Sequence, residues 1–277
     1  MKYVSYTHNG RATYGHVEGD TVSDLGAIPG APADLVAALK ASALAGLKAP
    51  ATLPLADIKL LPVVTNPAKI FCVGHNYESH RVETGRAKVG HPSIFLRFAD
   101  TLNADSAEVL RPKSSISLDY EAELAIIIGK GGRYISEADA MSHVAGFTCA
   151  NDVSVRDWQW HTTQFAPGKN FPTTCPLGPW MVTPDEIDDL NAVSVPSRLN
   201  GQVMQHATLD HLLFPLPVII EYLSGFTTLN PGDVILTGTP GGVGAKREPP
   251  VWMKAGDVIE VEVSGIGTLK NNIADEA

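Results

Sequence analysis

Two glutamates, Glu121 and Glu123, stand two residues apart at the head of an apolar run, Leu124 to Ile128. Side chains two apart in a strand point to the same face, so the two carboxylates would lie side by side. Burying neighbouring negative charges costs several kcal/mol per charge unless a proton or a cation compensates. An isolated E-x-E more often marks a solvated strand end, but next to this apolar run the spacing raises the possibility of a cation site.

A third carboxylate strengthens the case for a cation. Asp152 ends another apolar run, "GFTCAND", about thirty residues later, and a helical connection between the two runs could return the chain to the same sheet. Three carboxylates without a soft ligand nearby favour a hard cation, Mg²⁺ first and then Mn²⁺ or Ca²⁺. Zinc is not expected, because the histidines show no H-E-x-x-H or comparable spacing.

A candidate acid-base pair lies in "NYESHRVE", where His80 and Glu83 are three residues apart. On a helix they share a face, and Glu83 could hold the imidazole in one tautomer and raise its basicity, as a general base requires. An exposed polar pair on a surface helix is the simpler interpretation of the spacing alone. Nothing pairs the other histidines considered, which are interpreted as surface or packing residues: His75, His161, His206 and His211.

The elements that must position these residues are mostly strands. Residues 1 to about 60 indicate short strands, a helical stretch "APADLVAALKASALAGLK" and a Pro-punctuated linker. From Ile70 onward, runs between Gly and Pro breaks predict strands in "KIFCVG", "SIFLRF", "ELAIIIG", "HVAGFTCAND", "GPWMVT", "SVPSRLNGQVMQ", "DVILTGTPGGVG" and "DVIEVEVSGIGTLKN".

Two helices are expected to interrupt these strands, one over 136–144 with Ser136 as its N-cap and one over 214–226 ending at Gly225. The order of elements fits neither alternating βα units nor a repeat array, which argues against a Rossmann or barrel plan. We therefore predict a mostly β (α+β) fold, with a small N-terminal α+β domain and linker at 1–63 and a catalytic domain at 64–277.

The composition narrows the classes of partner. The net charge is −9 and no basic cluster occurs, so neither nucleic acid nor an anionic membrane is an expected partner. No stretch approaches the roughly 18 to 20 apolar residues that span a bilayer, and no signal-peptide pattern opens the chain, so a cytoplasmic location is expected. The cysteines are expected to be reduced, and none is marked as catalytic by a neighbouring base: Cys72, Cys149 and Cys175.

Several collinear motifs resemble the fumarylacetoacetate hydrolase family, in the manner of a small two-domain bacterial-type member. They run from about Ile70 to the C-terminus: "VGHNYESH", "DYEAELAIIIGKGGRYIS", "GFTCANDVSVRDWQ", "GKNFPTTCPLGPWMVT", "SRLNGQVMQ" and "LNPGDVILTGTPGGVG". The resemblance implies a mixed β-roll catalytic domain, usually in a homodimer. It also implies Mg²⁺ or Mn²⁺ as the cofactor and a small 2-oxo or β-diketo acid as the substrate.

The resemblance also implies roles for individual residues. The metal ligands would be Glu121, Glu123 and Asp152. His80 and Glu83 would form a catalytic dyad on a lid segment that orders over the substrate. Lys169 would lie near the substrate oxygens, and Gln159 would make a polar contact with the substrate. Thr239 would help to bind the substrate carboxylate. Taken alone, the turn "TGTPGGVG" could aim N–H groups at an anion or be a tight turn without a ligand.

Three positions depart from the family pattern. Arg97 stands where members commonly carry lysine, Phe98 replaces a frequent proline, and His75 occupies a position where an apolar or other residue is common. Because a guanidinium is a planar fork suited to carboxylates, Arg97 is predicted to change the distal part of the substrate pocket.

The leading functional hypothesis is a divalent-metal-dependent hydrolase that cleaves a C–C bond in an acylpyruvate or another β-diketo or 2-oxo acid. His80 would activate water and Lys169 would stabilise the oxyanion. The alternatives on the same metal site are an oxaloacetate decarboxylase or tautomerase, or a 2-hydroxydienoate isomerase. A distant alternative is a non-catalytic Ca²⁺-binding β module, which would have no need of His80, Glu83 and Lys169 beside the acidic residues.

Overall fold

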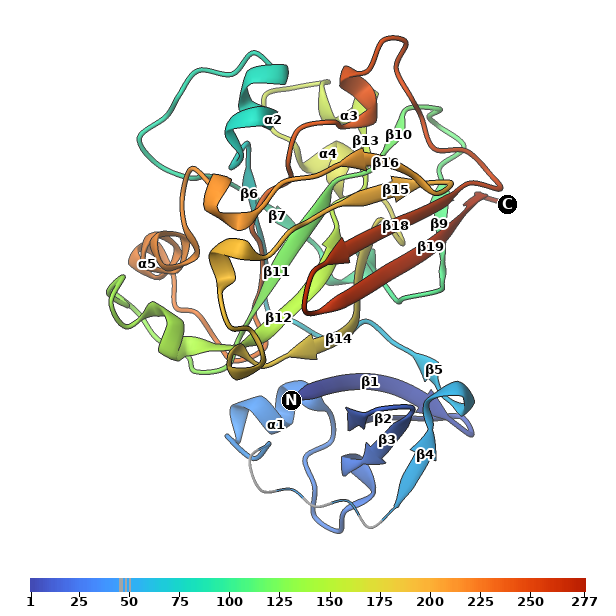
Figure 1. Ribbon diagram of the computed structural model, residues 1–277, viewed down its shortest axis with the longest axis vertical. Coiled ribbons are helices and arrows are strands. Elements are labelled where there is room, and N and C mark those ends of the chain that lie inside the picture. The colour runs from blue at the N-terminus through green and yellow to red at the C-terminus, as the bar shows by residue number, and fades with distance from the viewer. Residues whose placement is uncertain (45–46, 48, 50) are drawn as a thin grey trace.

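The computed structural model describes residues 1–44, 47, 49 and 51–277, and strands dominate it as predicted (Figure 1). The strands of the large central sheet are β1 (Lys2–His8), β2 (Arg11–Glu18), β3 (Thr21–Asp24), β4 (Thr52–Pro54), β5 (Lys59–Leu60), β6 (Ile70–Gly74), β7 (Ser93–Arg97), β8 (Leu102–Asn103), β11 (Ala122–Ile128), β12 (Val144–Asn151), β14 (Cys175–Val182) and β17 (Val234–Leu236). Their order is β4-β3-β2-β1-β14-β12-β11-β17-β6-β7, with β5 beside β1 and β8 beside β14.

A second, smaller sheet packs against the centre of the first. Its order is β16-β15-β18-β19-β9, from β9 (Glu108–Arg111), β15 (Ser197–Leu199), β16 (Gln202–Gln205), β18 (Val258–Val263) and β19 (Gly267–Asp275). Val261 and Leu269 of this sheet share a core with Leu124 and Ile126 of β11, so the two sheets meet face to face. Near the site, β10 (Leu118–Asp119) pairs with β13 (Ser154–Val155).

Strand β11 is buried on both faces, which explains its unbroken apolar run. Leu124, Ile126 and Ile128 pack into the core that also contains α5 (Leu216–Phe226). Ala125 and Ile127 face the opposite core. A strand covered on both sides has no solvated face, so it does not alternate apolar with polar residues. Glu123 therefore lies on one of the most enclosed strands of the molecule, and Glu121 directly precedes that strand.

The N-terminal strands extend the central sheet, as the lower layer of Figure 1 shows. Tyr3 of β1 pairs with Met181 of β14, and α1 (Leu35–Lys40) packs into a core that includes Ile70 and Leu177. Part of the predicted helical stretch, at 45, 46 and 48, lies outside the described residues. The domain boundary between 63 and 64 stays a prediction.

The helix predicted over 136–144 is wrong. Ala140–His143 form a short 3₁₀ helix that leads directly into β12, and Ser136 Oγ only caps a turn by accepting the Asp139 N–H at 3.2 Å. Because β11 and β12 are antiparallel neighbours, a loop suffices to join them and no helical crossover is required. The helix predicted over 214–226 is confirmed as α5, which ends one residue beyond Gly225.

The remaining helices are short and lie around the site: α2 (Glu78–Glu83), α3 (Arg156–Gln159) and α4 (Ala166–Lys169). In the described part of the chain, none of the helices combines the length and the apolar character needed to cross a membrane.

Candidate active site

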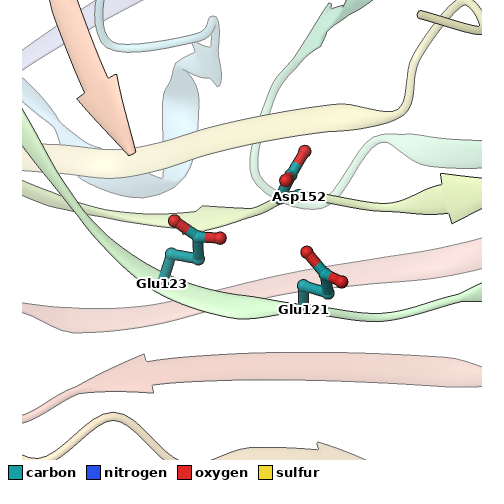
Figure 2. Close-up of side chains that lie close together, drawn as sticks. All are labelled: Glu121, Glu123 and Asp152. Atoms are coloured by element: carbon teal, nitrogen blue, oxygen red, sulfur yellow. The ribbon is translucent and has the colours of Figure 1, made fainter. Parts of the chain in front are cut away.

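Glu121, Glu123 and Asp152 meet where β11 begins and β12 ends (Figure 2). The antiparallel register pairs Ala122 with Asn151, and the Asp152 N–H donates to the Glu121 carbonyl oxygen at 2.9 Å. One carboxylate oxygen from each acidic residue lies within 4.8 Å of the others, and all three residues are buried. The structure thus brings together the three carboxylates that the sequence singled out.

Buried cations compensate part of this charge. Lys169 Nζ donates to Glu121 Oε2 and to Asp152 Oδ2, both at 2.7 Å. Arg156 Nη2 lies 2.7 Å from Glu121 Oε1 in an ion pair. Burial alone would raise the pKa of Glu121, but the charges of Lys169 and Arg156 outweigh it and hold that pKa well below its usual range. Glu121 is therefore ionised at neutral pH.

Glu123 lacks such compensation. Its Oε2 accepts the Gly238 N–H at 2.6 Å, and no lysine or arginine among the described residues forms an ion pair with it. Burial, followed by the charges of Asp152 and Glu121, raises the pKa of Glu123 well above its usual range. A divalent cation with oxygen ligands would supply the missing positive charge, so the donor set fits a hard metal ion.

The predicted acid-base pair is present and is not an exposed surface pair. His80 in α2 is 4% exposed, and its Nδ1 lies 2.7 Å from Glu83 Oε1. Glu83 Oε2 accepts the Gly242 N–H at 2.9 Å, so both carboxylate oxygens are held. Because Nδ1 donates to the carboxylate, Nε2 is the ring nitrogen that can accept a proton in the cavity.

The glycine-rich loop after β17 holds three of the protein's own carboxylates. Glu123, Glu83 and Asp119 accept N–H groups at 2.6, 2.9 and 2.8 Å, respectively, from Gly238, Gly242 and Gly244. A carboxylate receiving such N–H groups is fixed in position and needs no external anion there. The loop therefore binds anions, as its glycines indicate, but in this structure the anions belong to the protein.

Thr239 lies in the same loop and lines the cavity. Its hydroxyl donates to the Ala122 carbonyl oxygen at 2.9 Å and accepts from Gln205 Nε2 at 2.7 Å. The single hydroxyl proton is thus engaged with β11. A contact between Thr239 and a substrate carboxylate stays a prediction.

Two charged residues that the sequence analysis overlooked support the site. Arg156 Nε donates to Asp119 Oδ2 and its Nη1 donates to Gln159 Oε1, both at 2.8 Å, while its third nitrogen reaches Glu121. A signal for each was available in the sequence. Arg156 is three residues from the predicted Gln159, and Asp119 extends the two-residue alternation of Glu121 and Glu123.

His75 is not the ordinary surface or packing residue that the sequence indicated. It lines the cavity and stacks on His80, with ring centroids 5.2 Å apart and an interplanar angle of 12°. Burial, and then the neighbouring His80, lowers the pKa of His75 to about 4. Its ring is therefore neutral at pH 7.

Arg97 is placed beneath the carboxylates instead of in the distal pocket. Its Nη1 donates to Asp152 Oδ1 and, at 3.2 Å, to the Val153 carbonyl oxygen, and its Nη2 donates to Thr174 Oγ1 at 2.6 Å. The side chain is fully buried, and it is not among the described residues that line the cavity. The expected contact with the distal part of a substrate is not made in this geometry.

A cavity of about 470 Å³ lies over the three carboxylates and is also lined by His75, His80 and Thr239. Its inner end is formed by the three carboxylates together with Lys169, Arg156 and Gln159. Phe95, Phe165 and Trp160 form apolar walls, and two cations, Arg86 and Lys246, lie among the outer lining residues. A cavity of this size suits a small organic acid.

Comparisons with known proteins agree with this geometry. The family model "Fumarylacetoacetate (FAA) hydrolase C-terminal" matches residues 69–274. A mitochondrial oxaloacetate tautomerase of Xenopus laevis is 45% identical over 219 residues, which cover 78% of this chain and 69% of that protein. Among solved structures, a fumarylacetoacetate hydrolase from psychrophilic Exiguobacterium antarcticum is 34% identical with a TM-score of 0.88. A 5-carboxymethyl-2-hydroxymuconate delta-isomerase from Mycobacterium smegmatis is 31% identical with a TM-score of 0.84, and both matches cover all of each chain.

Proposed function

Because the chain belongs to the fumarylacetoacetate hydrolase family, whose members similar to it are enzymes, we propose that it is a metal-dependent keto-enol tautomerase of oxaloacetate or a closely similar 2-oxo acid. The observation that carries this proposal is that the N–H groups of the glycine-rich loop donate mainly to side chains of the protein itself. The proposal differs from the leading hypothesis of the sequence analysis, C–C hydrolysis, and adopts one of the alternatives named there.

Hydrolysis of a C–C bond passes through a tetrahedral oxyanion, which needs free hydrogen-bond donors. The natural source is the loop beside the carboxylates, but most of its N–H groups are engaged. Those of Gly238, Gly241 and Gly242 donate to protein side chains at 2.6, 3.0 and 2.9 Å, whereas the N–H of Thr239 has no partner among the described residues. Pro240, between them, has no N–H to offer. Tautomerisation makes no tetrahedral oxyanion and needs only a proton carrier beside a stabilised enolate.

The residues of the cavity can perform that proton transfer. A divalent cation held by Glu121, Glu123 and Asp152 would act as a Lewis acid on the 2-oxo carboxylate and acidify the neighbouring C3–H bond. His80 Nε2 accepts the C3 proton, because Glu83 fixes the other ring nitrogen as a donor. The resulting imidazolium returns the proton to the substrate oxygen, so one histidine suffices for both steps.

Lys169 acts as a fixed positive charge in this scheme. Burial opposes its charged form, but Asp152 and Glu121 outweigh burial and raise the pKa of Lys169 above its usual value. An ammonium group with a raised pKa is a poor proton donor. It stabilises negative charge that develops on the substrate oxygens, and it leaves proton transfer to His80.

Mg²⁺ or Mn²⁺ is the proposed cofactor, with Ca²⁺ as an alternative, because the three candidate ligands are all carboxylates and hard cations take oxygen ligands. The non-catalytic Ca²⁺ module is not retained, because the similar proteins are enzymes and the His80–Glu83 pair adjoins the carboxylates. Hydrolysis of an acylpyruvate is the second candidate function. It is favoured by the same pair, which could activate a water molecule, and by the likeness to a solved hydrolase.

The test follows each product by NMR in D₂O with added Mg²⁺ or Mn²⁺. A tautomerase exchanges the C3 protons of oxaloacetate and speeds keto-enol interconversion without forming pyruvate, and chelator abolishes both effects. Glu123→Gln with the same metal concentration controls for catalysis by free metal ions. Rapid conversion of an acylpyruvate to pyruvate and a carboxylic acid, without faster exchange of oxaloacetate, would replace the proposal by the hydrolase.

A further inference from the structure

His75 has an unusual backbone conformation at the edge of the cavity, between β6 and α2. Its φ is +55°, a left-handed value that few non-glycine residues adopt, although histidine is among the more tolerant. The next residue holds this conformation in place. Asn76 donates to the Phe214 and Thr237 carbonyl oxygens at 3.0 and 2.8 Å and accepts the Phe214 N–H at 2.8 Å. A backbone strain that neighbouring contacts fix in this way often serves a site.

The ring of His75 has polar atoms that the protein leaves unused. Neither ring nitrogen has a hydrogen-bond partner among the described residues, although the ring packs against His80 and, at 5.9 Å between centroids, against Phe165. A neutral imidazole offers one N–H donor and one acceptor, and this ring lines the cavity. The donor is therefore available to a molecule bound there.

A positive charge without an acidic partner among the described residues lines the same cavity. Arg86 Cζ is 5.9 Å from the centroid of Phe165, so His75 and Arg86 flank one aromatic side chain. Arg86 forms no ion pair with another described residue, in contrast to Lys169 and Arg156 at the inner end. An unpaired guanidinium and a free N–H that line one cavity are groups suited to bind a carboxylate.

We propose that His75 is a substrate-binding residue that, with Arg86, holds a second carboxylate at the substrate end farthest from the carboxylate cluster. The enzyme would thereby select 2-oxo dicarboxylates over 2-oxo monocarboxylates. This inference rests on the proposed function and adds the substrate class to it. His75 binds as a neutral donor, so it contributes no positive charge next to His80 while His80 carries the substrate proton.

The test compares two ligands that cannot react, L-malate and L-lactate, by calorimetry with the Mg²⁺-saturated protein. Both carry a 2-hydroxy carboxylate, and malate adds the distal carboxylate. Wild type should bind malate more tightly. His75→Ala should weaken malate binding about ten- to a hundredfold, as expected for a lost hydrogen bond to a charged group, and change lactate binding less than about twofold.

Two further variants serve as controls for this experiment. His75→Asn keeps a side-chain N–H and tolerates positive φ, so it should retain most of the preference for malate and shows whether a loss in His75→Ala is only misfolding. His211→Ala removes a ring that is 66% exposed, and it should bind both ligands as wild type does.

Three results would overturn the inference: no preference for malate in wild type, equal losses for both ligands in His75→Ala, or an unchanged ratio with a displaced pH-rate profile. The last would show that His75 acts through His80. Because the readout is binding, it is separate from turnover. A His75-dependent preference for malate in a protein that does not tautomerise oxaloacetate would keep the inference and reject the proposed function.

Discussion

The two ends of the cavity are built in different ways. At the inner end, the carboxylates lie at the ends of the adjacent strands β11 and β12, Lys169 reaches them from the short helix α4, and Asp152 and Lys169 are 0% and 1% exposed. Every charge there except that of Glu123 has a close partner. The outer end stands on a short helix and loops, and its wall residue Trp160 is 55% exposed. Strand register fixes the position of groups more strictly than loops do. The position of the candidate metal ligands is therefore set at the inner end, while substrate choice can vary at the outer end.

The largest effect should come from Glu123→Gln, which removes the one carboxylate of the inner end that has no ion-pair partner among the described residues. We expect metal binding and metal-dependent turnover to fall below detection in calorimetry and in the exchange assay. The fold should persist, because Gln can still accept the Gly238 N–H. Retained metal-dependent activity would remove Glu123 from the ligand set.

When chelator has removed the metal, Glu123→Gln should be more stable than wild type, although it has lost metal-dependent activity. Because the pKa of Glu123 is raised in the folded protein, the folded state keeps a proton that the unfolded chain releases above about pH 4.3, so stability falls as the pH rises. A glutamine side chain does not titrate, so the variant does not lose this stability as the pH rises. The melting temperature of Glu123→Gln should therefore exceed that of wild type at pH 7 and approach it near pH 4.

At the outer end, His80→Ala should slow exchange of the C3 protons by roughly 10² to 10⁴. Metal affinity should change little, because His80 lies on α2 and donates to Glu83, and it is not among the three carboxylates that would hold the ion. Calorimetric titration with Mn²⁺ checks the second point. A large loss of metal affinity would mean that the two ends are not separable.

Glu83→Gln should lower kcat by about ten- to a hundredfold and alter the pH-rate profile. The amide oxygen can accept only one of the two hydrogen bonds that Glu83 accepts, from His80 and from Gly242. Glu78→Gln is the matched control on the same helix, since Glu78 pairs with Arg81 at the surface. Similar kinetics for the two variants would show that Glu83 does not orient His80.

The smallest effect should follow Arg97→Lys, which keeps the charge beneath Asp152 but cannot reach all of its partners. A support of this kind typically changes metal affinity by about tenfold, so we expect that loss with a small decrease in melting temperature. Relative rates across a panel of 2-oxo acids should not change. A changed substrate profile would restore Arg97 to the distal pocket, as the sequence predicted.

The strands and the three carboxylates could be predicted because their signals are local. An apolar run between breaking residues marks β11, and the two-residue spacing of Glu121 and Glu123 places them on one face. The prediction of a helix at 136–144 was wrong, because β11 and β12 are antiparallel neighbours that a loop can join, whatever helical pattern the local sequence has.

Residues that act through tertiary contacts were harder to place. His75 has no partner by spacing, and its role depends on a turn that stacks it on His80. Arg97 sits behind Asp152 because β7 runs beside β6 in the sheet, a pairing that sequence spacing does not reveal. Homodimer formation and a cytoplasmic location remain predictions from the sequence.

The glycine-rich loop has a consequence for attempts to redesign this enzyme. One backbone segment supports Glu123, Glu83 and Asp119, so an insertion or a glycine replacement there would disturb the metal site, the proton carrier and the Arg156 support together. At Gly238, for example, an added Cβ would lie 2.7 Å from Asn76 Cβ. Libraries aimed at new substrates should leave this loop intact and vary Trp160, an exposed wall residue outside it.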